Sequence, residues 1–526
     1  MSTPQHPTGD DASNWFDDPN YWYRPEEAPE RPKRIANGVY GNGRLANQRD
    51  LETLLNEPEG DDRALTFPET TVLVEDPQDS TKLQPLIHRN LHLPAELREK
   101  HVLAIGQTGV GKTQKLILPQ LACDIADPNR TVIALDAKGG VLYEFMQNLA
   151  KRHRPHQKVL QINLKRPERC TTAWNPVIGM KTRSEALEIA HAVCTNVDSG
   201  IPPKDPFWVN SSIALLADVL YALAQDPKEN QSLVRAKALI DGFPNDMAVF
   251  ADAHPKGYPA IYRVLENAHQ NPNTSIIADL AMRLMLFGDE GVAACTSGKN
   301  ELSIPDLISN GGMLVLEVFE SDAAEVVPLT NLFITRLFST LMHEANRCAD
   351  RRLPRPTSLT LDELGSACGK IPDFEKRLAT LRSRGVSLIG AVQTLSQLHH
   401  LYEMGASAII GNFNTKLFFG GGLGLADSKF ASDLSGTMTA ESVTIIETEH
   451  GEMTSVTRSR TPVARPVLLP EEVARPPVHP LLGTPLTVFT PSLPPFFAYL
   501  KHAFELWQIN WALQPYRTQN PPTMGR

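Results

Sequence analysis

The stretch that decides the fold lies at residues 101–122 and reads HVLAIGQTGVGKTQKLILPQLA. Its first residues form a short apolar run typical of a buried strand, and an apolar helix is predicted to begin at Thr113. Between the two, the pattern GxxxxGK[ST] is matched in full by Gly106, Gln107, Thr108, Gly109, Val110, Gly111, Lys112 and Thr113. A match between a strand and a helix indicates a phosphate-binding loop, or P-loop.

Each residue type in this loop has a physical role in holding a nucleotide. Glycines let backbone N–H groups turn toward phosphate oxygens, and the N-terminus of the following helix adds partial positive charge. Lys112 is predicted to reach the β- and γ-phosphates, and the Thr113 hydroxyl is predicted to bind Mg²⁺. The sequence therefore predicts an ATPase that uses ATP and Mg²⁺.

Hydrolysis also needs carboxylates at the end of a neighbouring strand, and residues 358–363, SLTLDE, supply them. We expect Asp362 to hold the magnesium shell and Glu363 to polarise the attacking water. A further apolar run at 386–392 ends in Gln393, whose amide is expected to sense the γ-phosphate. The order P-loop, acidic strand, polar strand end is that of RecA-like motors rather than of small GTPases.

Short apolar runs rich in β-branched residues recur along the chain and predict a parallel sheet covered by helices on both faces. They lie at 131–135, 159–164, 313–319, 358–361, 386–392 and 416–419. From about 182 to 290 the strands stop, and helical patterns follow at 184–196, 207–224, 233–241, 258–269 and 275–287. The predicted fold class is α/β, a RecA-like P-loop NTPase domain with an inserted all-α domain.

The predicted domain organisation follows from these patterns. It comprises a disordered acidic and aromatic tail (1–34), a nucleotide-binding domain in two parts (35–181 and 293–495), an inserted all-α domain (182–292), and an aromatic C-terminal segment and tail (496–526). A hairpin is predicted over 442–447 and 453–458, with its turn at His450 and Gly451. Pro-rich sequence from 462 to 495 is predicted to wrap the end of the fold.

The charge of the chain limits how it can contact nucleic acid. The formal net charge is -9, and charged residues make up 21% of the chain. Residues 1–30 hold seven acids and one arginine, so the remainder is close to neutral. Coating of nucleic acid by positive charge is therefore disfavoured, and any DNA contact must be local.

The cysteine and hydropathy patterns indicate the compartment. Six cysteines are scattered without a CxxC pair, so neither a zinc site nor a disulfide framework is indicated, and a reducing cytosol fits best. The sequence shows no run of 18 uninterrupted apolar residues and no secretory signal pattern. We therefore expect a cytoplasmic protein that does not itself span a membrane.

Two aromatic segments leave alternatives open. The N-terminal one either packs on its own domain or is a docking peptide for a partner; it contains Trp15, Phe16, Tyr21, Trp22 and Tyr23. The second, at 496–516, either packs on the body or makes an interfacial membrane or partner contact. It cannot span a bilayer, because it is interrupted by Lys501, His502, Glu505 and Asn510.

Residues 361–419 read LDELGSACGKIPDFEKRLATLRSRGVSLIGAVQTLSQLHHLYEMGASAIIGNFNTKLFF. The acidic strand, the KIPDFE helix start, the RSRG turn, the QTLSQL segment and the IIGNFNTK segment together resemble the TraG/TraD/VirD-type coupling proteins of type IV secretion and conjugation. Supporting matches are Asp136-Ala137-Lys138-Gly139, Trp174-Asn175-Pro176, Asp205-Pro206-Phe207-Trp208 and the GNGRLA segment at 41–46. The resemblance runs from about residue 38 to 499.

This resemblance implies a homo-hexameric ring with ATP at its subunit interfaces, which recruits and pumps single-stranded DNA or a DNA–protein complex. Relaxase or other transfer proteins are the implied partners. In such a ring, Arg382 occupies the position of the arginine that a neighbouring subunit supplies to the γ-phosphate, with Arg384 as the fallback. Asp136 and Lys138 match the family's Asp-x-Lys motif near the nucleotide.

The sequence also departs from the family pattern. Transmembrane helices are not predicted at its N-terminus, which implies a soluble form at the inner face of the cell membrane, recruited to a secretion channel by a membrane-anchored partner. Ala137 and Gly140 replace the usual Pro and acidic residue.

Two alternative functions are an FtsK- or HerA-like pump of double-stranded DNA, which the KIPDF and QLHHLY segments disfavour, and an ATP-switched module that recruits protein cargo.

Overall fold

The computed structural model describes residues 31–35, 38–55, 64–87, 90–196, 206–254, 257–266, 268, 271–450 and 453–513. The aromatic cluster predicted in the N-terminal tail and the predicted turn at Gly451 lie outside these residues. The chain divides into two compact units. Unit 1 comprises Met1–Arg98, Val102–Gln120 and Asn414–Trp507, and unit 2 comprises Glu99–His101, Leu121–Phe413 and Gln508–Arg526.

Unit 1 is built on six strands that lie in the order β3, β2, β15, β14, β11, β5. Their bounds are β2 (Thr71–Glu75), β3 (Leu83–Ile87), β5 (Val102–Ile105), β11 (Thr415–Phe419), β14 (Leu486–Phe489) and β15 (Phe496–Tyr499). β5 and β11 pair in parallel, and the other neighbours are antiparallel. Every residue of β5 and β11 is buried, as expected for parallel strands covered on both faces.

Further elements of unit 1 surround this sheet. β1 (Leu65–Pro68) and β4 (Asn90–Leu93) form a separate antiparallel pair. The helices α1 (Gln48–Leu55), α18 (Leu425–Ser435) and α19 (Pro470–Ala474) also belong to this unit, and α18 packs on α19. The Pro-rich stretch from 462 to 495, which was predicted to wrap the end of the fold, contains both α19 and β14.

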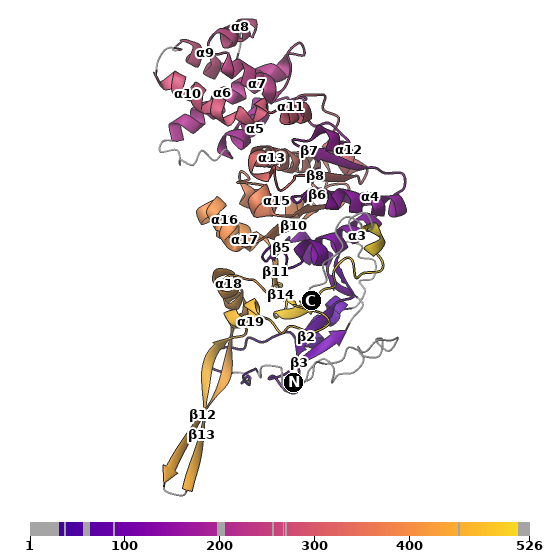
Figure 1. The fold of residues 1–526 in the computed structure, drawn as a ribbon, viewed down its shortest axis with the longest axis vertical. Helices are drawn as coiled ribbons and strands as arrows, with labels where there is room; N and C mark the ends of the chain where they lie inside the picture. Colours follow the sequence, from indigo (N-terminus) through magenta and orange to yellow (C-terminus); the bar gives the residue numbers. More distant parts are fainter. Residues whose placement is uncertain are drawn as a thin grey trace. The chain divides into compact units, whose positions relative to one another are not determined.

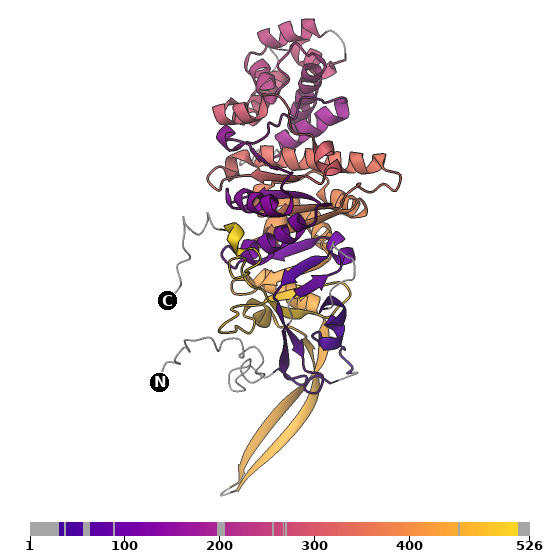
Figure 2. The same ribbon diagram turned by 90° about the vertical axis from the view of Figure 1, so that its right-hand side faces the viewer.

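A long antiparallel hairpin extends from α18 and α19, as the two views in Figures 1 and 2 show. Its strands are β12 (Thr437–His450) and β13 (Met453–Pro466). The sequence predicted only residues 442–447 and 453–458, which leave out both ends of β12 and the second half of β13. Among the strands of the described residues, β13 pairs with β12 alone, and a proline is tolerated in a strand whose outer edge has no neighbour.

Unit 2 contains five parallel strands in the order β10, β9, β6, β8, β7. Their bounds are β6 (Thr131–Asp136), β7 (Val159–Asn163), β8 (Met313–Glu317), β9 (Thr357–Leu361) and β10 (Val386–Val392), each within two residues of its predicted run. α4 (Val141–His153) packs on β6, β7 and β8, and α15 (Phe374–Ser383) packs on β10. α13 (Ala323–Arg347) follows β8 and contacts α15. The carboxyl ends of these strands share one edge.

Between β7 and β8 the chain is helical, and these helices gather at the top of Figure 1. They are α5 (Arg183–Thr195), α6 (Pro206–Gln225), α7 (Leu233–Asp241), α8 (Asn245–Ala253), α9 (Pro259–Glu266), α10 (Asn271–Arg283) and α11 (Glu290–Thr296), and the short helix α12 (Ile304–Ser309) then leads into β8. The prediction missed α8, although its buried residues Met247, Phe250 and Ala251 have helical spacing. The observed fold class is the predicted one, α/β with an inserted all-α region.

α6 is the one helix in the described part of the chain that is long and apolar enough to cross a membrane, judged by length and composition. It contacts α5, α7, α9 and α10, and 56% of its apolar window is buried. Packing against four helices accounts for this composition, because a helix at the centre of a helical cluster is apolar on most of its faces.

Candidate nucleotide-binding site

The P-loop in unit 1 joins β5 to a helix that begins at Lys112. Gly109 and Gly111 have φ angles of 89° and 98°, which residues with a side chain rarely adopt. A Cβ atom added at Gly106 would lie 2.8 Å from the Cβ of Phe419 in β11. The backbone conformation therefore requires glycine at positions 109 and 111 of the loop, and packing requires glycine at position 106.

The Lys112 side chain is folded into this loop. It is 3% exposed, and its ammonium donates hydrogen bonds to the carbonyl oxygens of Gly106 and Gln107, the second at 3.3 Å. Burying an ammonium is costly unless strong acceptors surround it, and a carbonyl carries only partial negative charge. A phosphate is a stronger acceptor for the same group. The donor set of the loop therefore fits a phosphate chain.

The helix after the P-loop opens with a π-helical turn, and Pro119 follows this turn. The turn η3 (Lys112–Ile117) runs directly into α3 (Leu118–Ala126). The N–H of Leu118 donates to the carbonyl of Thr113, five residues earlier, and Pro119 has no N–H to donate. Carbonyls in the first helical turns therefore need other donors. Single π-turns within helices are frequent at functional sites.

The C-terminal segment supplies one of these donors. The N–H of Ala503 donates to the carbonyl of Gln114 at 2.9 Å. Burial lowers the pKa of the neighbouring Lys115 ammonium, and the carboxylate of Glu505 acts in the opposite direction. Of the two alternatives left open for this segment, packing on the body is the one observed for residues 496–507. The side-chain oxygen of Gln114 is buried and accepts no hydrogen bond from any described residue, so a bound ligand could supply the donor.

The acidic residues predicted for hydrolysis lie at the carboxyl edge of the unit 2 strands. Asp362 and Glu363 directly follow β9 and are 1% and 5% exposed. Lys138, after β6, places its ammonium 4.0 Å from a carboxylate oxygen of each. Gln393, after β10, donates its side-chain amide to Glu363 Oε2 at 3.1 Å. Four predicted residues from three adjacent strands are thus brought together in unit 2.

Glu363 adopts a backbone conformation that is rare for a residue with a side chain. Its φ and ψ are 63° and 49°, in the left-handed region, where it begins the short helix α14 (Leu364–Ala367). Such a conformation costs about 1–3 kcal/mol, and it persists where the surrounding structure holds it in place. Gln397 fixes Gln393, the hydrogen-bond partner of Glu363, by accepting its backbone N–H at 3.0 Å. The sequence signal for Gln397 was the QTLSQ spacing, which places it four residues after Gln393.

Asp136 shapes the turn that carries Lys138. Its carboxylate accepts backbone N–H groups from Lys138, Gly139 and Leu142 at 3.1, 3.0 and 2.9 Å. Burial raises the pKa of Asp136, and the three hydrogen bonds from backbone N–H groups favour its ionised form. Asp136 therefore fixes the turn that carries Lys138 and the first turn of α4. The family resemblance by itself did not indicate this role.

Sequence reasoning missed one acidic residue at this edge. Glu317 ends β8 beside Asp136 in the strand register and is fully buried. Its carboxylate accepts two hydrogen bonds from Arg169, at 3.0 and 2.7 Å, and one from Asn163 at 3.2 Å. The available signal was an acid at the end of a predicted strand, but its arginine partner lies 148 positions earlier in the chain.

Arg382, the predicted trans-acting arginine, lies at the opposite end of β10 from Gln393. It is exposed in the last turn of α15, which precedes the first residue of β10. β10 has seven residues, so its ends are roughly 20 Å apart. The fallback, Arg384, donates to the carbonyl of Arg351 at 2.9 Å. Arg382 therefore lies far from the Asp362–Glu363 cluster of the same chain.

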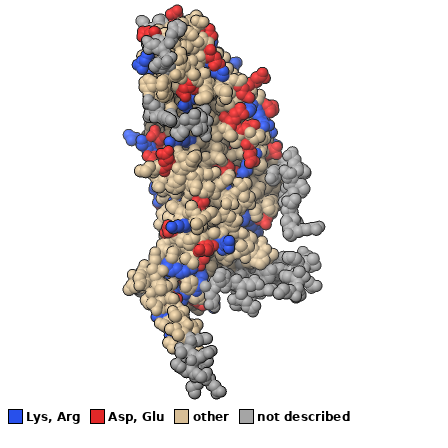
Figure 3. All heavy atoms as spheres, turned by 60° about the vertical axis from the view of Figure 1, so that its left-hand side comes forward, with Lys and Arg blue, Asp and Glu red and all other residues tan. Residues whose placement is uncertain are grey.

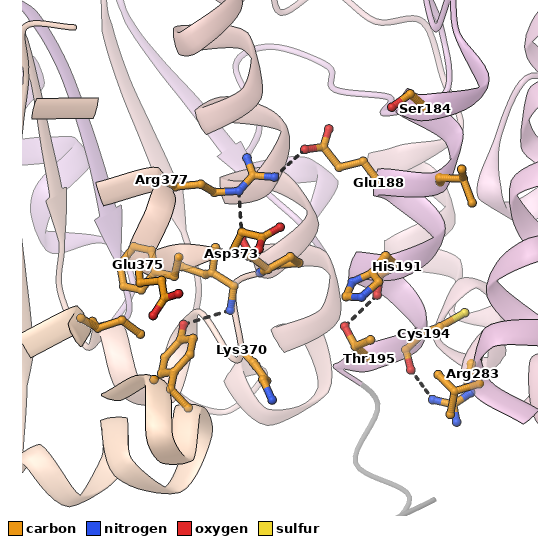
Figure 4. Close-up of a pocket in the computed structure, with 18 residues that line it drawn as sticks. Ser184, Glu188, His191, Cys194, Thr195, Arg283, Lys370, Asp373, Glu375 and Arg377 are labelled. Atoms are coloured by element: carbon orange, nitrogen blue, oxygen red, sulfur yellow. Dashed lines mark hydrogen bonds and ion pairs between the residues drawn. The ribbon is translucent and has the colours of Figure 1, made fainter. Parts of the chain in front are cut away.

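A cavity of about 800 Å³ lies elsewhere in unit 2, between α5 and residues 370–377. Figure 4 shows Arg377 pointing toward Glu188, with an ion-pair distance of 2.8 Å, and Arg283 meeting the carbonyl of Cys194. These arginines are engaged in structural contacts. None of the predicted nucleotide-site residues lines the cavity, so it is separate from the candidate site.

Fold and site define the class as a P-loop NTPase of the RecA-like type. Solved structures of bacterial coupling protein TrwB share the fold. The TrwBdeltaN70 form with sulphate has 17% identity and a TM-score of 0.64, covering 90% of this chain and 94% of that chain. TrwB with the ATP analogue ADPNP has 16% identity and a TM-score of 0.62, covering 90% and 95%. TrwB with ADP and Mg²⁺ has 18% identity and a TM-score of 0.59, covering 89% and 93%.

A sequence match over most of the chain shows which family it belongs to. Residues 65–480 match the family described as type IV secretory system conjugative DNA transfer, and the chain belongs to this family. No curated protein sequence shows significant similarity to the chain. The family resemblance carried by residues 361–419 is thereby confirmed.

Proposed function

We propose that this chain is an ATP-hydrolysing coupling protein that recruits and moves DNA for conjugation or type IV secretion. The observation that carries the proposal is the cluster of Asp362, Glu363, Lys138 and Gln393 at one strand edge. In a chain that also carries a complete P-loop, such a cluster supports hydrolysis as well as nucleotide binding. Membership of the conjugative DNA transfer family supports DNA as the cargo.

The residues have distinct roles in the proposed reaction. Lys112 holds the β- and γ-phosphates, and Glu363 accepts the proton of the water that attacks the γ-phosphorus. Mg²⁺, held by Thr113 and Asp362, would neutralise charge on the phosphate oxygens. Gln393 fixes the Glu363 carboxylate through its amide and transmits the state of the nucleotide to β10. TrwB, which shares the fold, has been solved with ADPNP and with ADP and Mg²⁺, which supports these cofactors.

The position of Arg382 supports a ring assembly. An exposed guanidinium at the amino end of β10 serves the hydrolysis step only if it reaches the nucleotide of another subunit. We therefore propose a homo-hexamer in which Arg382 stabilises the charge that develops on the transferred phosphoryl group of its neighbour.

DNA contact is proposed to be local. On the face shown in Figure 3, basic and acidic side chains are interspersed among uncharged ones. This distribution suits a strand that is held at a few points and released at each step better than one that is coated. Single-stranded DNA with an attached relaxase is the proposed cargo. The proposed location is the cytoplasmic face of the membrane, through a membrane-anchored partner of the secretion channel.

The test is ATP turnover by the full chain, alone and with single- or double-stranded DNA. Single-stranded DNA should stimulate turnover, while Lys112→Ala should lose nucleotide binding and Glu363→Gln should keep binding and lose turnover. Stimulation by double-stranded DNA alone would favour a double-stranded DNA pump instead. Turnover that no DNA stimulates but a protein partner does would contradict the motor and support a recruitment module.

A further inference from the structure

Residues 500–506, which follow β15 in unit 1, lie beside the first helical turn after the P-loop. We propose that this segment, together with Gln114, is the nucleoside subsite of the P-loop, with the stacked rings of His502 and Phe504 as the platform for a purine base. The inference rests on the proposed function, because it takes the ligand of the P-loop to be a nucleoside triphosphate.

The connectivity of the P-loop places the segment at the nucleoside end of the ligand. The loop backbone cradles the α- and β-phosphates, while Lys112 and the Thr113 hydroxyl serve the β- and γ-phosphates and Mg²⁺. Gln114 is the next residue, and its carbonyl is the one that accepts the N–H of Ala503 at 2.9 Å. Because Pro119 has no N–H, this hydrogen bond replaces a helical one and fixes the segment against the helix.

Buried anchors give the segment a defined conformation. Leu500, Ala503 and Leu506 are 5%, 0% and 1% exposed. Between them, Glu505 Oε2 accepts the backbone N–H of His502 at 2.7 Å and lies 3.1 Å from His502 Nδ1. His502 is therefore held by Glu505 at both its backbone N–H and its imidazole ring. A platform that is rigid before binding loses little conformational entropy when a base stacks on it.

The chemistry of the segment suits a purine. The rings of His502 and Phe504 are both half-buried and stack with centroids 4.9 Å apart and an interplanar angle of 16°. Stacking uses the π-face that every base has, so it favours purines without distinguishing adenine from guanine. The buried Gln114 Oε1, which accepts no hydrogen bond from any described residue, can accept one from a hydroxyl or amine of the nucleoside.

The experiment compares the binding of ATP, GTP and inorganic triphosphate to the full chain in the presence of Mg²⁺. In Phe504→Ala we expect ATP and GTP to bind about tenfold more weakly and triphosphate to bind as in the unmodified chain. Gln114→Ala should show the same selectivity, and Phe504→Tyr should restore nucleotide affinity. Trp507→Ala is the matched control, because it removes a nearby aromatic side chain that is 72% exposed, and it should leave all three affinities unchanged.

Each other result overturns the inference in a recognisable way. Equal losses for ATP and triphosphate in a folded Phe504→Ala protein would mean that the segment only supports the P-loop. No loss for either ligand would place the nucleoside elsewhere. If Phe504→Ala does not fold, Phe504→Leu keeps the apolar bulk without the flat ring and is read by the same criteria. Failure of the proposed function looks different, because Lys112→Ala would then leave the binding of both ligands intact.

Discussion

The side-chain amide of Gln393 donates a hydrogen bond to the carboxylate of Glu363 at 3.1 Å, linking the ends of the adjacent strands β10 and β9. A carboxylate that acts as a base must present one oxygen to water while its orientation is fixed through the other. The Gln393 amide fixes Oε2, and Lys138 lies 4.0 Å from Oε1. The bond thus joins the proposed base to the proposed sensor of the γ-phosphate.

Replacing Gln393 should therefore impair hydrolysis more than nucleotide binding. We expect Gln393→Ala to lower the maximal rate of ATP turnover by about tenfold to a hundredfold, because the Glu363 carboxylate loses its orienting donor. Gln393→Glu should be at least as severe, since a second carboxylate at this place opposes ionisation of Glu363. Steady-state turnover and equilibrium nucleotide binding measure the two effects. A Gln393→Ala protein with full turnover would remove Gln393 from the mechanism.

A second prediction concerns the buried pair of Arg169 and Glu317. Arg169→Ala leaves a fully buried carboxylate without its charged partner, which should lower the free energy of unfolding by about 3 kcal/mol. The control is Arg166→Ala, whose more exposed ion pair with Asp322 should contribute less than about 1 kcal/mol. Urea denaturation measures both. If the double variant Arg169→Met/Glu317→Leu is no more stable than Arg169→Ala, the unpaired charge is not the cause of the loss.

The residues at the same edge of unit 2 show which parts of the site could be predicted from the sequence. Asp362, Glu363 and Gln393 were predictable, because each directly follows a short apolar run whose strand character is local. Glu317 and Arg169 were not, because their pairing joins β8 to a turn 148 residues away. The contact of Ala503 with Gln114 was equally hidden, since it depends on a donor that Pro119 removes from the helix.

The bounds of the helices and strands could also be predicted only where the sequence pattern is local. Parallel strands were predicted to within two residues, because burial on both faces makes each a continuous apolar run. The hairpin was predicted too short, because its exposed strands carry no such run and two prolines, Pro462 and Pro466, lie within β13. The helix α8 was missed although its apolar residues have helical spacing, because Gly242 and Pro244 just before it are typical of a loop.

A third prediction concerns pH and the buried His101 in unit 2. Burial lowers its pKa to about 4, from an ordinary value of 6.5. Its Nδ1 accepts the N–H of Leu388 at 3.2 Å, so Nε2 carries the proton and donates to the carbonyl of Leu378 at 2.9 Å. The folded state therefore holds a neutral imidazole, whereas the unfolded chain takes up a proton below pH 6.5. Stability should be lost as the pH falls from 6.5 toward 4.

The expected loss between pH 7 and pH 5 is about 2 kcal/mol in the free energy of unfolding. His101→Gln should be less stable at pH 7, because a packed ring and its hydrogen bonds are altered, but it should lose less stability on acidification. His400→Gln, at an exposed position, is the control and should keep the acid sensitivity of the unmodified chain. Equal acid sensitivity in His101→Gln would show that other groups cause it.

The last prediction tests whether Arg382 acts on a neighbouring subunit. Arg382→Ala should bind nucleotide normally and lower turnover by about 10³-fold or more, because a stabilising charge is absent from the transition state. Glu363→Gln should be inactive because each subunit loses the catalytic base of its own site. In rings mixed from the two variants, some interfaces combine an intact Glu363 with an intact Arg382 from the neighbour, so part of the activity should return. Mixed rings as inactive as either parent would mean that Arg382 does not complete a neighbour's site.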